Sequence, residues 1–438
     1  MLERRGFRIG FATVVLFTVL AGDAWRYSIS WYGWGVLVLG ITVAAITLLA
    51  HNRGWAKQLP YSLVAFLVLA TVSITWSFYP GASALGVTAQ WLTTVVALSV
   101  AITLSWDELL SALGLALRLI LGLSLAFELV ISLFVRHPVL PFWVDYGGHT
   151  RLPKLLYWSR DVLFTDGKIQ GIVGNSSLLA MIALFGLIVF AVQLAAGTVG
   201  RLGGIAWLVL AALTAAITRS ATIFIGIAVC AALLIAILCI RRARTPRARA
   251  GVYWSIAGVI LIGATLATVF GRQLLTVLGK SADLTGRVGI WDAVIGLAQQ
   301  RPAFGWGWVS YWVPWVAPFN HLVTRAGVQQ LHAHNAWLDV WLQLGILGLV
   351  VFGAFVLITI LRAWFVATDR PQFAPDAQGR YTATSLLPIL ILAALVVQSL
   401  AESRLLVEYG WLLLVVLAVK MKQREPVRTR MPAVRTGA

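Results

Sequence analysis

Charge is scarce in this sequence, and acidic charge most of all. Of the 438 residues, 11% are charged and 60% are hydrophobic, with 34 basic residues against 16 acidic ones. A soluble globular domain carries roughly 25% charged residues, so this composition excludes an ordinary soluble domain. Strand-period alternation of polar and apolar residues is also missing, which favours helices for the apolar segments.

Cysteine is nearly absent, and the motifs of common soluble enzymes are missing. Cys230 and Cys239 lie within one apolar run, where they are expected to pack as small apolar residues. The chain has no C-x-x-C, H-E-x-x-H, G-x-S-x-G or D-x-D sequence, and its "GKS" at 279–281 lacks the first glycine of a phosphate loop. These absences argue against a disulfide framework, a cofactor and a nucleotide-fuelled active site.

Long apolar runs are what the sequence does contain. They approach the length of about 20 residues that crosses a ~30 Å hydrocarbon core as a helix. We therefore predict an all-α polytopic membrane protein, a single integral domain over residues 1–438 with about twelve transmembrane helices. The predicted spans are 9–22, 30–50, 60–78, 85–104, 109–135, 175–196, 203–219, 221–240, 253–270, 337–361, 385–400 and 405–420.

The basic residues are distributed unevenly between the two sides of these spans. A formal charge of +18 would suggest nucleic acid as the partner of a soluble protein. Here the arginines gather at the termini and in alternate loops, including "RRARTPRAR" and the tail at 421–438, whereas the opposite short loops hold only Arg26, Arg219 and Arg404. The positive-inside rule therefore places both termini in the cytoplasm and the protein in the cytoplasmic membrane, with membrane lipids rather than nucleic acid around it.

Two long segments face outward under this topology, at 136–174 and 271–336. The first is rich in aromatic and basic residues, which suits packing at the headgroup level. The second contains "TGRVGIWDAVIGLAQQRP", in which apolar residues recur at helical spacing after Thr285, a suitable N-cap. This pattern predicts a short amphipathic helix that rests on the outer membrane interface; its apolar face would be Ile290, Trp291, Val294, Leu297 and Ala298.

Two arginines are candidates for binding an anion. Arg219 lies between two apolar runs, where a charge costs roughly 2.5 to 3.5 kcal/mol at the bilayer centre and needs a partner. It would either reach the outer headgroups or serve as the cation for an anionic ligand. Arg287 lies in the first turn of the predicted amphipathic helix, where free N–H groups already favour a phosphate, although an ordinary surface arginine would look the same.

The remaining polar candidates lie near the ends of the last spans. Glu402 and Arg404 lie in "AESRLLVEYG", where they would form a mutual salt bridge or position a neighbouring residue. His332 and His334 could bind a metal with Asp339, but no fourth ligand has suitable spacing, so no metal is predicted. A histidine just outside the membrane is instead suited to remove a proton from a sugar hydroxyl.

Several short motifs resemble those of one membrane family. "HNAWLDVWLQLGILG" fits H-N-x9-G-x-x-G, with His334, Asn335, Gly345 and Gly348 in register. "GRVGIW" followed by "RPAFGWGW", "TRSATIFIG" and "GIVGNSSLLA" also have counterparts, in the same order. The chain thus resembles the O-antigen ligase and O-antigen polymerase superfamily over most of its length. It departs from the family at Gln343, where an acidic residue is common, while Asp339 lies one helical turn earlier.

The resemblance implies a metal-independent, inverting glycosyltransferase that works outside the cytoplasmic membrane. Its donor would be a glycan linked to a polyprenyl pyrophosphate, and its acceptor a lipid, glycan or protein hydroxyl. Under this hypothesis His334 takes the acceptor proton, and Arg219 and Arg287 stabilise the charge of the departing pyrophosphate.

The other motif residues receive supporting roles from the same resemblance. Asn335 and the Glu402 and Arg404 pair would orient the base or the substrate, with His332 as an auxiliary. Gly345 and Gly348 would allow a helix or a lipid to approach closely. A repeat-unit polymerase of the same superfamily is the alternative. A lipid or glycan transporter is a further one, but transporters place their binding groups near the midplane on broken helices in paired halves, and no paired halves are visible in the sequence.

Overall fold

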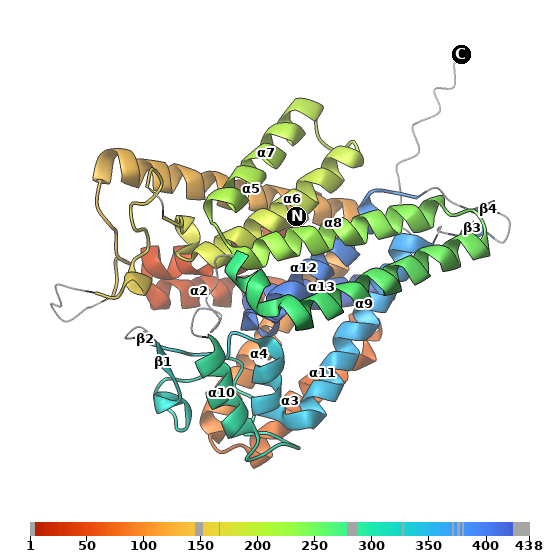
Figure 1. Cartoon of the computed structure of the whole chain (residues 1–438). Coiled ribbons are helices and arrows are strands. Elements are labelled where there is room, and N and C mark those ends of the chain that lie inside the picture. The colour runs from red at the N-terminus through yellow and green to blue at the C-terminus, as the bar shows by residue number, and fades with distance from the viewer. Residues whose placement is uncertain are drawn as a thin grey trace.

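The computed structural model describes residues 5–144, 152–165, 167–277, 287–325, 328–369, 372–374, 377–378 and 381–423. These residues are almost entirely helical (Figure 1). The helices are α1 (Arg5–Leu20), α2 (Gly22–Ala50), α3 (Tyr61–Val72), α4 (Pro80–Thr103), α5 (Trp106–Val130), α6 (Ser176–Ala195), α7 (Arg201–Ile217), α8 (Ala221–Arg242), α9 (Pro246–Val277), α10 (Arg287–Ala298), α11 (Ala336–Thr368), α12 (Leu387–Ser399) and α13 (Glu408–Gln423).

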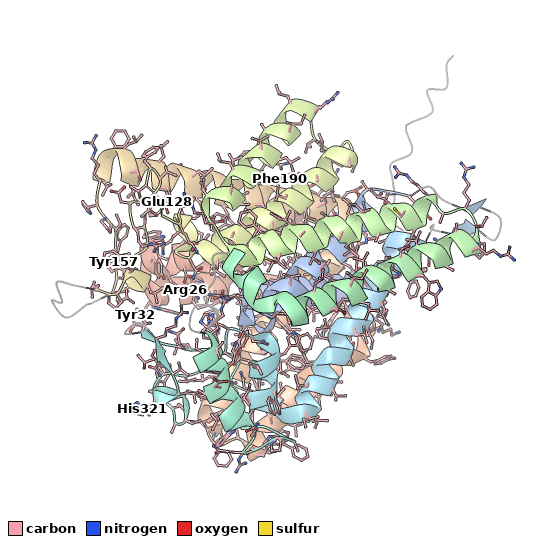
Figure 2. The ribbon with its side chains drawn as sticks, in the orientation of Figure 1. Arg26, Tyr32, Glu128, Tyr157, Phe190 and His321 are labelled. Atoms are coloured by element: carbon pink, nitrogen blue, oxygen red, sulfur yellow. The ribbon has the colours of Figure 1, made fainter. Side chains whose placement is uncertain are left out.

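The described residues also contain two short antiparallel strand pairs. Strand β1 (Thr324–Arg325) pairs with β2 (Val328–Gln329), and β3 (Gln372–Ala374) pairs with β4 (Ala377–Gln378). The two pairs lie at opposite edges of the molecule, β1 and β2 near α10 on the left and β3 and β4 on the right in Figure 1. Figure 2 places Tyr32, Tyr157 and His321 along the same left edge.

The apolar helices confirm a multi-pass all-α membrane protein. Among the described residues, 6 helices are long and apolar enough to cross a membrane: Gly22–Ala50, Pro80–Thr103, Trp106–Val135, Ser176–Ala195, Ala221–Arg242 and Ala336–Thr368. Each predicted span range coincides with a helix, because an apolar run that cannot expose its backbone to lipid folds locally as a helix. The number of twelve spans stays a prediction.

The helix starts follow from local capping residues. Ser105 and Glu108 form a capping box at the start of α5, which satisfies two backbone N–H groups that the helix leaves free. The side chain of Asn175 accepts hydrogen bonds from the backbone N–H groups of Ser177 and Leu178 at the start of α6. The asparagine of the "GIVGNSSLLA" motif is therefore a helix cap.

Helix α2 begins earlier than the sequence predicted. The sequence analysis placed Arg26 in a short loop before a span that starts at residue 30, but the helix extends from Gly22 and has a break at Ser30, with φ 70° and ψ 171°. Arg26 is buried in the first part of this helix, where Asp23 lies one turn before it. The prediction that Arg26 lies in a loop was wrong, because an arginine that is paired within the protein can be part of an apolar helix.

Helix α11 is interrupted at Gly345, which has φ 67° and ψ −165°. The segment 302–307 fills the interruption: the Ile346 N–H donates to the Pro302 carbonyl (2.8 Å) and the Trp306 N–H donates to the Leu342 carbonyl (3.0 Å). A Cβ at Gly345 would lie 2.2 Å from the Ala303 carbonyl carbon, so only glycine fits. The P-x-x-G-x-G and H-N-x9-G motifs therefore meet here, and the chain's own loop makes the close approach.

Helix α10 has the apolar face that its spacing predicted, but in a different environment. Ile290, Val294, Leu297 and Ala298 are buried in a cluster that includes Phe319 and Leu342, and the helix packs on α11. The apolar face thus packs against protein, whereas the sequence predicts that it faces the membrane; the position of α10 at the outer interface stays a prediction. The predicted N-cap Thr285 lies outside the described residues.

A buried carboxylate attaches the first long loop to α5. Glu128, which is fully buried, accepts hydrogen bonds from the Ser159 hydroxyl (2.8 Å) and from the backbone N–H groups of Gln170 (2.9 Å) and Gly171 (2.7 Å). Backbone groups inside a protein need such partners. The loop that the sequence analysis assigned to membrane-interface packing is therefore fastened to the protein at this point.

Candidate functional site

The carboxylate of Glu402 connects two other candidates from distant parts of the chain. Its Oε1 accepts a hydrogen bond from Arg287 Nη2 at 2.8 Å, and its Oε2 lies 2.9 Å from His334 Nδ1. The side chains of Arg287, Glu402 and His334 are 17%, 13% and 18% exposed, so they are largely shielded but reachable. We call these three residues the Arg–Glu–His cluster.

The ion pair that the sequence suggested between Glu402 and Arg404 is not formed. Glu402 pairs with Arg287 and His334, whereas Arg404 donates to Glu408 one helical turn later. Both glutamates accept charge-assisted hydrogen bonds, which are stronger than neutral ones. The contacts of Glu402 thus agree with the alternative prediction, in which this residue positions a neighbouring side chain.

Asp339 fastens together the two loops that carry His334 and Glu402. Its fully buried carboxylate accepts hydrogen bonds from the Ala333 N–H, at 3.0 Å, and from the Ser403 hydroxyl. Ala333 directly precedes His334, and Ser403 directly follows Glu402. Asp339 therefore links the two loops through two hydrogen bonds to its Oδ2.

His332 lies against His334 as a neutral ring. The two ring centroids are 4.0 Å apart, and the His334 backbone N–H donates to His332 Nδ1 at 3.1 Å, which requires that this nitrogen carry no proton. Burial lowers the pKa of His332 well below its ordinary value, and the charge of His334 lowers it further. His332 is therefore neutral at pH 7.

Glu402 is ionised at neutral pH. Burial would raise the pKa of its carboxyl, but the charge and hydrogen bond of His334, together with the charge of Arg287, lower that pKa to about 2. The ionised carboxylate accepts a hydrogen bond from the Nδ1–H group of His334.

Both ring nitrogens of His334 face hydrogen-bond acceptors. Nε2 lies 3.0 Å from the side-chain oxygen of Gln330, whose amide nitrogen donates to the Val328 carbonyl. Nε2 can take a proton from a substrate only when it carries no proton of its own and Gln330 has turned away. His334 also has φ 51°, a left-handed conformation that is strained for a residue other than glycine.

Asn335 caps α11 with its side chain. Its Oδ1 accepts hydrogen bonds from the backbone N–H groups of Trp337 (3.0 Å) and Leu338 (3.3 Å), and its Nδ2 donates to the Leu400 carbonyl at 3.5 Å. The H-N pair thus places a strained histidine directly before a helix cap.

Arg219 lies in the turn between α7 and α8, apart in sequence from the cluster. Its side chain is exposed and its φ is 48°. Of the two predicted cations, Arg287 donates a hydrogen bond to Glu402. The role of Arg219 stays a prediction.

Gln343 supports the loop that runs beside the cluster. Its buried Oε1 accepts hydrogen bonds from the backbone N–H groups of Val309 (2.8 Å) and Ser310 (3.0 Å). A carboxylate at this position would accept the same two hydrogen bonds. The glutamine that replaces the family's acidic residue therefore preserves the contact with the loop. Sequence reasoning missed Gln330, Ser403 and Tyr311, since none stands in a recognisable spacing with the histidines.

Three residues of the site have the donor types of a metal centre. Single ligand atoms of His332, His334 and Glu402 lie within 4.8 Å of one another. The direct hydrogen bond between His334 and Glu402, and the ion pair of Glu402 with Arg287, occupy the carboxylate oxygens. A cation bound here would have to displace both contacts and would lie beside a guanidinium of the same sign.

One comparison with known proteins found a match. Residues 204–353 match the family model described as O-Antigen ligase, which is less than half of the chain. The match contains Arg219, Arg287 and His334, and ends before Glu402. No curated protein matches the chain. Residues 204–353 are therefore similar to the O-antigen ligase family, and this match confirms the predicted resemblance to the O-antigen ligase and polymerase superfamily.

Proposed function

We propose that the protein transfers a glycan from a polyprenyl-pyrophosphate donor to an acceptor hydroxyl on the outer side of the cytoplasmic membrane. The observation that carries this proposal is the Arg–Glu–His cluster, which combines a proton acceptor, its orienting carboxylate and a cation in one largely buried site. The family match over residues 204–353 supports the same type of activity.

His334 performs the proton transfer in this scheme. Its Nε2 removes the proton of the acceptor hydroxyl while the oxygen attacks the anomeric carbon, a contribution typically worth about 10²–10⁴ in rate. The new carbon–oxygen bond forms as the bond to the pyrophosphate breaks on the opposite side, so the anomeric configuration inverts. Glu402 holds the ring and stabilises the imidazolium that results.

Arg287 stabilises the negative charge that develops on the departing pyrophosphate. Fixed cations stabilise a developing anion without a metal ion, because they need no reorganisation during the reaction. Its guanidinium lies 2.8 Å from Glu402 and has further N–H donors for a phosphate oxygen. Arg219 is the second proposed cation, and Asn335, His332 and Arg404 are proposed to shape the substrate site.

The proposal uses the membrane topology that the sequence predicts. About twelve spans with both termini in the cytoplasm place the segments 136–174 and 271–336 outside. A transporter would use a broken helix near the midplane, and α11 is broken at Gly345. Residues 302–307 occupy that break, however, and the three cluster residues lie outside the break: Arg287 and His334 precede α11, and Glu402 follows α12. This arrangement favours the enzyme.

The test is glycan transfer by the purified protein with a chelator present. The host's polyprenyl-pyrophosphate glycans and envelope acceptors serve as substrates, and products are read by gel and mass spectrometry. We expect product from the wild type and from His321→Ala, an exposed histidine outside the cluster, and a rate lowered by about 10²–10⁴-fold for His334→Ala. A single product size indicates ligation and a ladder indicates the polymerase alternative. Equal product from folded His334→Ala would overturn the mechanism.

A further inference from the structure

Arg118 lies within an apolar helix that is long enough to cross a membrane, more than three turns after α5 begins at Trp106. Its Nη2 donates to the side-chain oxygen of Gln193, and its guanidinium carbon lies 5.1 Å from the centre of the Phe190 ring. Both partners belong to α6 and both are neutral. A charge in a membrane span needs a partner of opposite sign or contact with polar headgroups, and these contacts supply neither.

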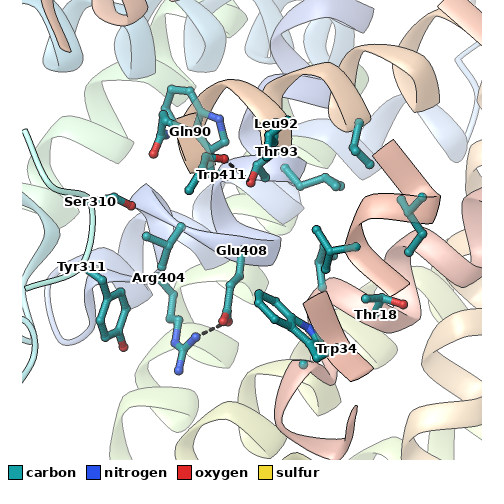
Figure 3. A pocket seen from close by; sticks show the side chains of 18 of the residues that line it. Thr18, Trp34, Gln90, Leu92, Thr93, Ser310, Tyr311, Arg404, Glu408 and Trp411 are labelled. Carbon is teal, nitrogen blue, oxygen red and sulfur yellow. Dashed lines mark hydrogen bonds and ion pairs between the residues drawn. The ribbon is translucent and has the colours of Figure 1, made fainter. Parts of the chain in front are cut away.

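Two other arginines near the spans are neutralised by carboxylates. Arg26 pairs with Asp23 (2.6 Å) and Glu408 (2.9 Å). Arg404 pairs with Glu408 in the wall of a cavity between α1, α2, α4 and α13 (Figure 3). None of the ion pairs in the described part of the chain includes Arg118. Its positive charge is therefore uncompensated by the residues that the structure describes.

The side chain of Gln193 holds the guanidinium in one orientation. This glutamine is buried, and its amide nitrogen donates to the Leu110 carbonyl at 3.1 Å, so its oxygen is the atom that accepts from Arg118. A Cβ at Gly114 would lie 2.3 Å from Gln193 Nε2, so this glycine leaves the room that the glutamine occupies. A guanidinium has five N–H donors, and the described residues provide an acceptor for Nη2 alone.

Arg118 lies at the edge of an apolar surface that faces outward from the protein. It is partly exposed, and its neighbours Leu115 and Leu119 on α5 are 42% and 43% exposed. Leu123, one turn further along the same helix, is 48% exposed. Exposed apolar side chains on a membrane span contact lipid, so a lipid molecule can reach Arg118 from this side.

The guanidinium also lies near the level at which α6 ends. Gln193 is in the last turn of α6, and the N–H and hydroxyl groups of Thr198 both donate to its carbonyl in the turn that leads to α7. Backbone outside a helix does not occur beside hydrocarbon, which places this turn at the headgroup level. Arg118 reaches it because helical side chains point back toward the start of their helix. The predicted topology puts this turn on the cytoplasmic side.

We propose that Arg118 binds the phosphate of an anionic phospholipid of the cytoplasmic leaflet, beside the end of α6. A guanidinium binds phosphate oxygens through two parallel N–H···O bonds, and a headgroup with one net negative charge balances the charge of Arg118. The acyl chains lie along Leu119 and Leu123. In the predicted topology this lipid site and the Arg–Glu–His cluster are on opposite sides of the membrane, so the site goes beyond the proposed function and does not depend on it.

Native mass spectrometry of the purified full chain tests the proposal without needing turnover. The wild type should bind one phosphatidylglycerol more tightly than a phosphatidylethanolamine with the same acyl chains, because the second headgroup has no net charge. Arg118→Gln should weaken this first binding step by about tenfold or more, the loss of one charge-assisted contact. Equally tight binding of the two lipids to the wild type would refute an anion site.

Arg201→Gln is the matched control for Arg118→Gln. Arg201 is exposed at the start of α7, faces the same predicted side, and has no side-chain hydrogen bond or ion pair with the described residues. Its substitution removes the same charge from the surface and should leave the first binding step unchanged. An equal loss in both variants would mean diffuse attraction to a basic surface and would overturn the site at Arg118.

A second pair of variants leaves Arg118 in place and guards against a folding defect. Leu115 lies three residues before Arg118, on the same face of the helix. Leu115→Glu supplies an internal carboxylate and should abolish the tight binding of phosphatidylglycerol, whereas Leu115→Gln, of the same size without the charge, should retain it. The unfolding midpoint in detergent should rise with added phosphatidylglycerol for Leu115→Gln and not for Leu115→Glu. The same response in both variants contradicts the proposal.

Two further observations separate a lipid from other anions at this position. Glycerol 3-phosphate, which carries the phosphate without acyl chains, should not compete with phosphatidylglycerol at equal concentration. The wild type and Arg118→Gln should also have the same oligomeric state. Competition by glycerol phosphate would make this a site for soluble phosphates, and a dimer that Arg118→Gln dissociates would make a second copy the partner; either result overturns the lipid site.

Discussion

At the scale of single residues, burial decides which groups near His334 carry charge. His332 stays neutral because burial and the charge of His334 lower its pKa. Glu402 stays ionised because the neighbouring cations outweigh the effect of its burial. A neutral ring and a carboxylate thus flank His334, the residue that we propose to exchange protons with the acceptor.

The buried His332 predicts a pH dependence of stability. An unfolded chain binds a proton at this residue below about pH 6.5, whereas the folded chain, with its lowered pKa, does not. The contribution of His332 is therefore complete above pH 6.5 and is lost as the pH falls. The midpoint of thermal unfolding in detergent should drop less between pH 7.5 and 5.5 for His332→Gln than for the wild type.

The exposed His321 provides the control for this measurement. His321→Gln removes a histidine without removing a buried one, so its slope should equal that of the wild type. Glu402 does not interfere, because its pKa of about 2 confines its loss of stabilisation to the range between its ordinary value of 4.5 and pH 2. An unchanged slope in His332→Gln would contradict the assigned protonation state.

At the scale of elements, the break in α11 joins two motifs that are separate in the sequence. Gly345 lets residues 302–307 enter the break in the helix. There they form hydrogen bonds with the backbone N–H and carbonyl groups of α11 that the break leaves without helical partners. The same segment continues to Val309 and Ser310, which Gln343 of α11 holds. The loop that carries Tyr311 is thereby fixed relative to the start of α11 and its histidines.

Substitution of Gly345 should therefore be far more damaging than substitution of another glycine in the same helix. Gly345→Ala adds a Cβ 2.2 Å from the Ala303 carbonyl carbon at a positive φ, and such a backbone conformation alone costs about 1–3 kcal/mol. At Gly353 a Cβ would meet only Trp337, at 3.8 Å. The yield of folded protein and the unfolding midpoint should fall for Gly345→Ala and hold for Gly353→Ala; equal effects would refute this account of the break.

At the scale of the whole molecule, sequence reasoning succeeded where the signal is local. The apolar runs predicted the positions of the helices, and the spacing after residue 287 predicted α10. It could not predict which surface α10 packs on, nor that Glu402 pairs with Arg287 and His334, which are 115 and 68 residues away. Such pairings depend on how the helices pack, and one sequence contains no periodicity that reports them.

Glu402 and His334 are proposed to act as one proton-transfer unit assembled by the fold. The most direct test is a double-mutant cycle on the initial rate of glycan transfer, with His334→Ala, Glu402→Gln and the double variant. We predict that His334→Ala lowers the rate by about 10²–10⁴-fold and that adding Glu402→Gln lowers it no further. If the two losses multiply in the double variant, Glu402 does not act through His334 and the account is wrong.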